Sequence, residues 1–336
     1  MKVYVNEVLS NPLGPSFPRK RESSDFGRTS LDSRFRGNDG TFFFLESSLL
    51  RTLAGVFTIA FILCAVPALA LEEVPYVQTP DRVVEGMLDL AAVRSGDYLI
   101  DLGSGDGRIV ITAALKRGTR GLGVEIDPRL VEKSRAVAKQ LGVEARAGFV
   151  EQDLFATDIR AANVLTMYLL PDVNLALRPR ILAEMKPGSR VVSHDWDMGE
   201  WKPDMSVTLD VPEKKIGLKK TSTLHLWMVP ARIAGTWRTR VPLASTRGPM
   251  EIELELEQKF QEIGGRAKTG GRVLPVERGF VHGELLFFRF GEGAEALLFK
   301  GRAGNGRIVG RITDAQGNEY PWRALREGPA AQAAAK

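Results

Sequence analysis

The chain has 336 residues, of which 44% are hydrophobic and 26% charged, and its formal net charge is +5. These shares are typical of globular proteins and exclude a fibrous or wholly disordered chain, and the length suits two domains with additional segments. Basic and acidic residues are interspersed, so we expect no nucleic acid partner. Cys64 is the single cysteine, and with only three histidines the chain cannot form a disulfide framework or a cysteine metal cluster. We therefore expect no metal site.

An apolar run near the N-terminus has the features of a targeting segment. It begins at Leu49 and reads LLRTLAGVFTIAFILCAVPALA, with Arg51 near its start and the small residues Ala68 and Ala70 at its end. This is the layout of a secretory signal peptide, and the run is also nearly long enough to span a bilayer. A buried helix of a soluble domain is the alternative. We assign residues 48–70 to a signal peptide or membrane anchor and expect a membrane-associated or exported protein, with the face of the membrane left open.

The residues before this run fit neither role. The stretch from Pro15 to Gly40 is rich in Arg, Ser and Gly, has no apolar periodicity, and resembles the translation of a dispersed bacterial DNA repeat. Its composition also permits a genuine disordered tail. We expect residues 1–47 to be a non-native or disordered leader.

From residue 71 to 229 the pattern is that of an α/β domain. Short apolar runs bounded by Gly, Pro and Asp alternate with longer helical patterns, which predicts strand–helix units around a parallel sheet. The first helix is predicted to have Thr79 as its N-cap and Pro80 at its first helical position. Apolar residues at helical spacing then follow, so this helix should pack on the sheet.

A glycine-rich loop follows the first predicted strand of this domain. Tyr98–Leu102 reads as a buried strand, and residues 103–107, GSGDG, form a tight loop into a helix. Glycine lets a ligand approach the backbone amides closely, although dinucleotide-binding enzymes use a similar loop. Asp101 lies two residues before Gly103, and Glu125 follows the next strand. These two acids and the loop spacing favour S-adenosylmethionine over a nicotinamide cofactor.

Five positions belong to the expected nucleoside site or to its frame. Glu125 can accept hydrogen bonds from both ribose hydroxyls, and Ile126 can cover one face of the adenine. We assign Asp127 and Pro128 to the cap and first residue of the next helix. Asp153, after the third strand, can accept from the adenine amino group, and a solvated turn residue is the alternative.

The candidate reacting groups follow the fourth and fifth strands. Tyr168 lies where open parallel sheets place ligands, outside the carboxyl ends of the strands, although it could also be a rim aromatic with its hydroxyl in water. The fifth strand ends in His194, Asp195 and Trp196. His194 can either take a proton or only orient a loop. We name Tyr168, His194 and Asp195 as the catalytic candidates.

An ordered series of motifs carries a family resemblance. PYVQTP, DLGSGDGRI, GVEID, DLF, YLLPDVN and PGSRVVSHDW, within about residues 74 to 229, resemble the seven-strand protein lysine methyltransferases of archaea and mitochondria. The resemblance implies a Rossmann-like seven-stranded sheet, N-methylation of protein lysine, and S-adenosylmethionine as the cofactor. It implies that the cofactor is held by Asp101, Gly103, Gly105, Glu125 and Asp153. To the same site we assign Tyr76, Thr79, Ser104, Gly107, Ile126 and Leu154.

Several alternatives remain for the activity. The partner implied by the resemblance is a protein substrate, membrane-associated if the apolar run is an anchor. A methyltransferase acting on a small molecule or a lipid, and a non-catalytic cofactor-binding envelope protein, are the competing hypotheses. Tyr76 and Trp196 are expected to line the acceptor channel with the catalytic candidates, and no residue is identified as an obligatory general base.

The last third of the chain has a different pattern. From residue 230 to 327 short alternating runs such as MEIELELEQKF are broken by glycines, which predicts an antiparallel sheet or a small barrel. Gly235-Thr236-Trp237 resembles the opening of lipocalin-like barrels. Residues 328–336 read as a disordered tail. This domain could recognise the substrate, or serve stability or partner binding.

Overall fold

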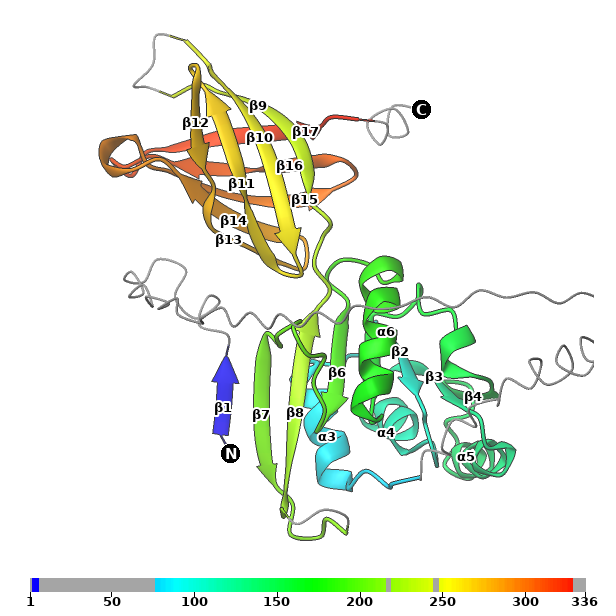
Figure 1. The fold of residues 1–336 in the computed structure, drawn as a ribbon. Helices are drawn as coiled ribbons and strands as arrows, with labels where there is room; N and C mark the ends of the chain where they lie inside the picture. The colour runs from blue at the N-terminus through cyan, green and yellow to red at the C-terminus, as the bar shows by residue number, and fades with distance from the viewer. Residues whose placement is uncertain (1, 6–75, 216–218, 244–247, 329–336) are drawn as a thin grey trace, which may run out of the picture. The chain divides into compact units, whose positions relative to one another are not determined.

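A computed structural model describes residues 2–5, 76–215, 219–243 and 248–328 (Figure 1). Most of the predicted leader and the whole apolar segment 48–70 lie outside the described residues. Strand β1 (Lys2–Val5) is described, and it pairs antiparallel with β7. In the described ranges, no helix has both the length and the apolar character needed to cross a membrane.

The first domain is a mixed sheet with the strand order β7-β8-β6-β5-β2-β3-β4, and β1 adds an eighth strand beside β7. Strands β2 to β6 run parallel where they pair, whereas β8 is antiparallel to both of its neighbours. The predicted Rossmann-like seven-stranded sheet is confirmed. Its strands are β2 (Tyr98–Leu102), β3 (Arg120–Glu125), β4 (Ala147–Glu151), β5 (Val164–Met167), β6 (Arg190–His194), β7 (Met205–Asp210) and β8 (Thr221–Met228).

Helices cover both faces of this sheet. One buried cluster joins the sheet to the first three helices, and a second joins the opposite face to the fourth. Successive strand residues enter different clusters, Leu99 the first and Ile100 the second, because side chains alternate across a strand. The helices are α3 (Asp81–Leu90), α4 (Arg108–Arg117), α5 (Pro128–Gln140) and α6 (Pro171–Glu184), and η1 (Leu154–Ala156) is a short 3₁₀ turn.

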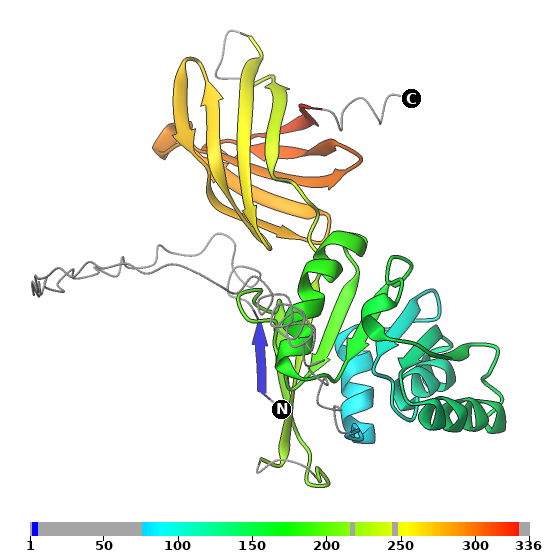
Figure 2. The ribbon, with the colours of Figure 1, turned by 45° about the vertical axis from the view of Figure 1, so that its right-hand side comes forward.

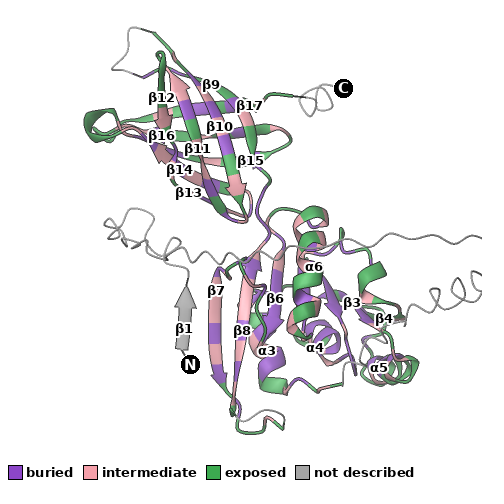
Figure 3. Ribbon diagram, in the orientation of Figure 1, coloured by how far each residue is buried: buried purple, intermediate pink, exposed green. Residues whose placement is uncertain are grey.

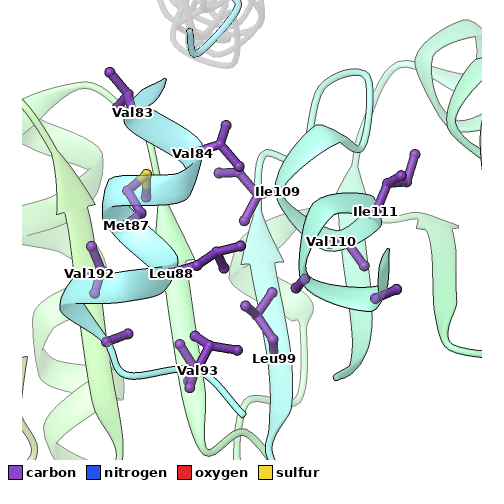
Figure 4. Packing of buried hydrophobic residues seen from close by; sticks show 14 of the residues in the cluster. Val83, Val84, Met87, Leu88, Val93, Leu99, Ile109, Val110, Ile111 and Val192 are labelled. Atoms are coloured by element: carbon purple, nitrogen blue, oxygen red, sulfur yellow. The ribbon is translucent and has the colours of Figure 1, made fainter. Parts of the chain in front are cut away.

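Helix α3 packs on the sheet through the predicted apolar stripe, in which Val83, Val84, Met87 and Leu88 are buried (Figure 4). The predicted cap was wrong. Pro80 occupies the N-cap position, with φ −60° and ψ 146°, and no side chain caps the helix. The extended ψ excludes Pro80 from the first turn, so the helix begins at the next residue.

Helix α5 begins as predicted. The side chain of Asp127 accepts from the backbone N–H of Arg129, and Pro128 is the first helical residue. Proline suits this position because its missing N–H would have no partner inside the helix.

The C-terminal domain is a closed antiparallel barrel, which confirms the barrel-like prediction (Figures 1 and 2). Its sheet has the order β10-β9-β17-β16-β15-β14-β13-β11-β12, and pairing of β10 with β11 closes the ring. The strands are β9 (Gly235–Val241), β10 (Met250–Lys259), β11 (Glu262–Thr269), β12 (Arg272–Pro275), β13 (Glu277–His282), β14 (Leu285–Phe290), β15 (Leu297–Gly304), β16 (Arg307–Thr313) and β17 (Glu319–Arg326), with a 3₁₀ turn η2 (Gly293–Glu295).

Side chains fill the inside of the barrel. Buried and exposed residues alternate along its strands, as the burial colours in Figure 3 show. Inside, the rings of Phe288 and Phe299 stack with centroids 4.8 Å apart, and Trp322 meets Phe299 edge-on at 5.0 Å. Such aromatic packing stabilises the barrel core, so contacts with other molecules fall to the outer surface of the barrel.

Candidate active site

The site lies where the strand order reverses. The chain proceeds from β2 outward through β3 and β4, then returns to the other side of β2 with β5 and β6. Asp101 on β2 is opposite Thr166 on β5, and the Thr166 hydroxyl donates to the Asp101 carboxylate at 2.7 Å. In open sheets the crevice at the carboxyl ends of two such strands is where ligands bind.

Asp101 is buried beneath the glycine loop. Burial raises the pKa of its carboxyl to about 7, the charges of Glu125 and Asp106 raise it as well, and the Thr166 hydrogen bond opposes them. The Thr166 hydrogen bond thus fixes the end of β2 from which the glycine loop begins. Thr166 was not predicted, because only the register of β5 against β2 brings the hydroxyl to the carboxylate.

The loop requires glycine on two grounds. Gly103, Gly105 and Gly107 have φ values of 71°, 54° and 75°, which residues with a Cβ rarely adopt. A Cβ on Gly105 would also lie 2.4 Å from the ring of Tyr76. The Ser104 hydroxyl in the same loop is buried and has no hydrogen-bond partner in the described part of the chain. The loop thus combines close backbone access with an unused polar group.

Glu125 ties the loop to the end of β3. Its Oε2 accepts from the Gly105 N–H at 2.8 Å, and its Oε1 accepts from the N–H groups of Ile126 and Asp127 at 2.8 and 3.1 Å. Carboxylate oxygens have capacity for further donors, such as a pair of hydroxyls. The Ile126 side chain is 71% exposed beside this carboxylate. This geometry suits the predicted ribose and adenine contacts, which stay predictions.

A charged cluster fixes the segment that precedes α3. Asp106 accepts from Gln78 Nε2 and from the Arg108 guanidinium, and Arg108 also donates to the Thr79 carbonyl oxygen at 2.7 Å. Burial opposes ionisation of Asp106, but hydrogen bonds from Arg108 and Gln78 hold its pKa at about 2. Burial and the charge of Asp106 raise the pKa of Tyr76 to about 12. Tyr76 and Thr79 are thereby held beside the loop through partners that were not predicted.

Asp153 lies after β4, at the same edge of the sheet. Its Oδ1 accepts from the Phe155 N–H at 2.8 Å and caps η1, and the side chain is exposed. Leu154 is half-buried against the cluster that covers the α6 face. Contact of either residue with adenine stays a prediction.

Tyr168 packs against a neutral histidine. Its ring centroid lies 3.9 Å from that of His194, with the ring planes 32° apart. His194 is fully buried, its Nε2 lies 2.8 Å from the Ser222 hydroxyl, and its Nδ1 has no partner in the described residues. Burial lowers the pKa of His194 to about 4, so the imidazole is uncharged near neutral pH. Burial, and then the charge of Asp195, raise the pKa of Tyr168.

Backbone conformation and two hydrogen bonds fix the position of Asp195. Its backbone has a φ of 63°, its Oδ1 accepts from the Thr223 N–H at 2.9 Å, and its Oδ2 accepts from Lys214 Nζ at 2.6 Å. The next residue, Trp196, is 43% exposed. A catalytic role for Asp195 stays a prediction. Lys214 was not predicted, because its loop between β7 and β8 has no motif.

These side chains fit S-adenosylmethionine. Only glycine fits the loop beside Tyr76, the buried Ser104 hydroxyl in that loop is unused, and Glu125 has acceptor capacity at the end of the neighbouring strand. Tyr168 lies across the strand reversal from them, at the end of β5. The predicted nucleoside residues thus lie on the β3 side of β2, and the predicted acceptor residues lie on the β5 side.

Comparisons with known proteins agree with this geometry. The family described as ANTKMT methyltransferase domain matches residues 101–205. The chain is 45% identical over 131 residues to the Protein-lysine N-methyltransferase of Saccharolobus islandicus (strain REY15A), a match that covers 39% of this chain and 81% of that protein. It is 33% identical over 191 residues to the ATP synthase c-subunit lysine N-methyltransferase of Mus musculus, covering 57% of this chain and 72% of that protein.

A solved structure is also similar. It is an RNA methyltransferase from Salinibacter ruber in complex with S-adenosyl-L-homocysteine, 50% identical, with 47% of this chain and 96% of that chain covered and a TM-score of 0.42. The family match includes the glycine loop, Glu125, Tyr168 and His194. With most of the archaeal relative covered at 45% identity, the chain belongs to the class I, S-adenosylmethionine-dependent methyltransferase family that includes the protein-lysine N-methyltransferases.

Proposed function

We propose that this methyltransferase acts on the side-chain amine of a protein lysine. When bound, S-adenosylmethionine supplies an activated methyl group on a neutral leaving group. The attacking amine must be uncharged and in line with the methyl–sulfur bond, so the protein has to position it and exclude water. The observation that carries the proposal is the close contact of Tyr168, which follows β5, with the neutral His194 at the end of β6.

This pair forms an uncharged aromatic wall. The neutral imidazole does not repel a lysine, the face of Tyr168 favours the positive charge that develops on the methylated amine, and the Tyr168 hydroxyl oxygen can accept from the amine N–H and orient it. The Asp195 carboxylate beside it is paired with Lys214, which limits its pull on the proton of the amine. The residues described here therefore act by desolvation and alignment. Relatives whose names specify lysine as their target support the same acceptor.

Product analysis tests the acceptor. The enzyme is incubated with radiolabelled S-adenosylmethionine and separate membrane and soluble fractions, and labelled protein is then hydrolysed. Methylated lysines are the expected product, and the rate should rise with pH until the bound lysine is mostly deprotonated. Label found only in lipid, in RNA or in base-labile methyl esters would refute the lysine acceptor and leave the methyltransferase activity intact.

Tyr168→Phe tests the wall. Removing the hydroxyl next to the acceptor should lower kcat about tenfold and leave the Kd for S-adenosylmethionine within about twofold, because Tyr168 contacts the acceptor and not the nucleoside. Steady-state kinetics and calorimetry measure the two quantities. Tyr98→Phe, at the amino end of β2, is the matched control and should change neither. Equal losses of turnover and cofactor affinity in Tyr168→Phe would contradict this role.

We also propose that the protein works at a membrane, on the strength of the apolar run at residues 48–70. S-adenosylmethionine is made in the cytosol, so an uncleaved anchor with the catalytic domain on the cytosolic side reconciles the run with the chemistry. Cell fractionation, with protease protection of the C-terminus, tests this topology. Recovery of the full-length chain wholly in the soluble fraction would exclude it.

A further inference from the structure

The outer surface of the barrel carries a group of cations that three neighbouring strands bring together. They lie at outward positions of β15, β16 and β17, where exposed residues alternate with core residues. Two exposed aliphatic side chains lie among them. We call this the basic face, and it consists of Lys300, Arg302, Arg307, Val309, Arg311, Arg323 and Leu325.

The strand register places these residues in rows. Lys300 is directly opposite Arg311, and Val309 lies between Arg302 and Arg323 in the next row. In the third row Arg307 is opposite Leu325. Lys300 and Arg311 form the one directly opposed pair of like charges in these rows, and such a pair is unfavourable in a sheet.

The acids near the basic face compensate only part of its charge. Arg302 pairs with Glu284 and Arg311 pairs with Glu319. The side chains of Lys300, Arg307 and Arg323 have no hydrogen bond or ion pair with any described residue. By contrast, the arginines of β9 are each paired with a glutamate on β10. The unpaired cations are thus concentrated on one side of the barrel.

The surface here is also hollowed and partly apolar. A groove of about 440 Å³ is lined by Arg302, Arg307, Val309 and Arg323 together with Glu284 and the turn after β15. A second groove, of about 700 Å³, lies mostly over β9 to β12, has Glu251 and Glu253 in its lining, and reaches the basic face at Arg323 and Leu325. Val309 is 46% exposed and Leu325 57% exposed, so apolar groups are available between the cations.

We propose that the basic face of the barrel binds the surface of a membrane that contains anionic phospholipids. Unpaired Lys and Arg side chains attract lipid phosphates, and short aliphatic side chains between them can enter the headgroup boundary. A single-stranded nucleic acid is less suited, because its bases stack on aromatic side chains and the apolar members of this face are aliphatic. The chain also contains the apolar run at residues 48–70, which would keep the barrel near a bilayer.

Vesicle binding tests the proposal with the full-length protein. Sedimentation is measured with vesicles of phosphatidylcholine alone and of phosphatidylcholine mixed with phosphatidylglycerol, at low and high salt. The triple variant K300Q/R307Q/R323Q is compared with a control, R82Q/R146Q/K186Q, that removes the same charge from exposed cations of the methyltransferase domain. All three proteins retain residues 48–70, so any difference between them comes from the substituted positions.

The wild type and the control should prefer the anionic vesicles and lose that preference at high salt. The basic-face variant should bind the anionic vesicles on the order of a hundredfold more weakly, at about fivefold for each cation removed. Its melting temperature should be unchanged or higher, since the repulsion between Lys300 and Arg311 is relieved.

Three results would overturn the proposal. The first is wild-type affinity of the basic-face variant for anionic vesicles. The second is an equal loss in both triple variants, which would reflect net charge alone. The third is an RNA oligonucleotide that binds the wild type, fails to bind the basic-face variant and displaces the vesicles, because the face would then recognise nucleic acid.

Discussion

Glu125 connects two parts of the site that are distant in sequence. Three backbone N–H groups donate to its carboxylate, one from the glycine loop and two from the end of β3. A charged acceptor in such a position lowers the freedom of the loop before any ligand arrives, and preorganisation of this kind favours binding. If the predicted ribose contact forms, Glu125 acts on the cofactor both through the loop and as a direct acceptor.

Glu125→Ala should weaken binding of S-adenosylmethionine about tenfold to a hundredfold, which is the cost of losing a charged hydrogen bond. Calorimetry on the folded variant measures this change. Glu132→Ala, on the exposed side of α5, is the matched control and should bind as the wild type does. Unchanged affinity in a folded Glu125→Ala protein would exclude Glu125 as the ribose acceptor.

At the scale of elements, local signals predicted most of the fold. Strand β2 has the predicted bounds, and α5 begins at its predicted cap, because the apolar run and the Asp-Pro pair are contiguous in sequence. Contacts between distant segments could not be predicted. Thr166 reaches Asp101 only through strand register, and Lys214 reaches Asp195 only because the β7–β8 loop returns to the end of β6.

The ion pair between that loop and β6 should modulate the pKa of His194. Burial is the main cause of the low pKa, the Asp195 carboxylate raises it and the Lys214 cation lowers it, so Lys214→Met should raise that pKa above about 4 while burial keeps it below the ordinary value near 6.5. Titration by NMR of the ring signals of His194 measures the shift. Lys219→Met, which removes an exposed cation of the same loop, should leave the titration unchanged.

The lowered pKa of His194 in the wild type also makes the stability of the protein depend on pH. Because the pKa of folded His194 lies below its unfolded value, the wild type loses stability as pH falls from about 6.5 through 4, where the unfolded chain binds the extra proton. The difference between the melting temperatures at pH 8 and pH 5 should therefore be smaller for Lys214→Met than for the wild type. A His194 titration identical in Lys214→Met and wild type would show that the ion pair has no influence on the ring.

At the scale of the whole molecule, each of the two domains builds its hydrophobic core from its own stretch of the chain. The two clusters of the α/β sheet use buried residues from Val83 to Val229, and the barrel cluster uses residues from Ala231 to Ala324. Partly buried residues also pack against the two sheet clusters, and among them only Phe260 comes from the barrel. Each domain therefore buries an apolar core of its own, as independent folding requires.

A fragment of residues 71–230 should accordingly fold and bind S-adenosylmethionine with the affinity of the full-length chain. Circular dichroism and calorimetry test the two properties. Loss of the Phe260 contact should cost little, because that side chain is only partly buried. An insoluble fragment beside a well-behaved full-length protein would mean that the barrel belongs to the catalytic core.

The burial of the tryptophans gives the molecule a built-in optical reporter. Of its five tryptophans, Trp201, Trp227, Trp237 and Trp322 are buried, and Trp196 alone is substantially exposed. An aqueous quencher such as acrylamide should therefore extinguish mainly the emission of Trp196, and Trp196→Phe should abolish this quenchable fraction. Because Trp196 follows Asp195 at the acceptor side of the site, a bound substrate peptide should shield it. Fluorescence could thus follow acceptor binding without a label and without turnover.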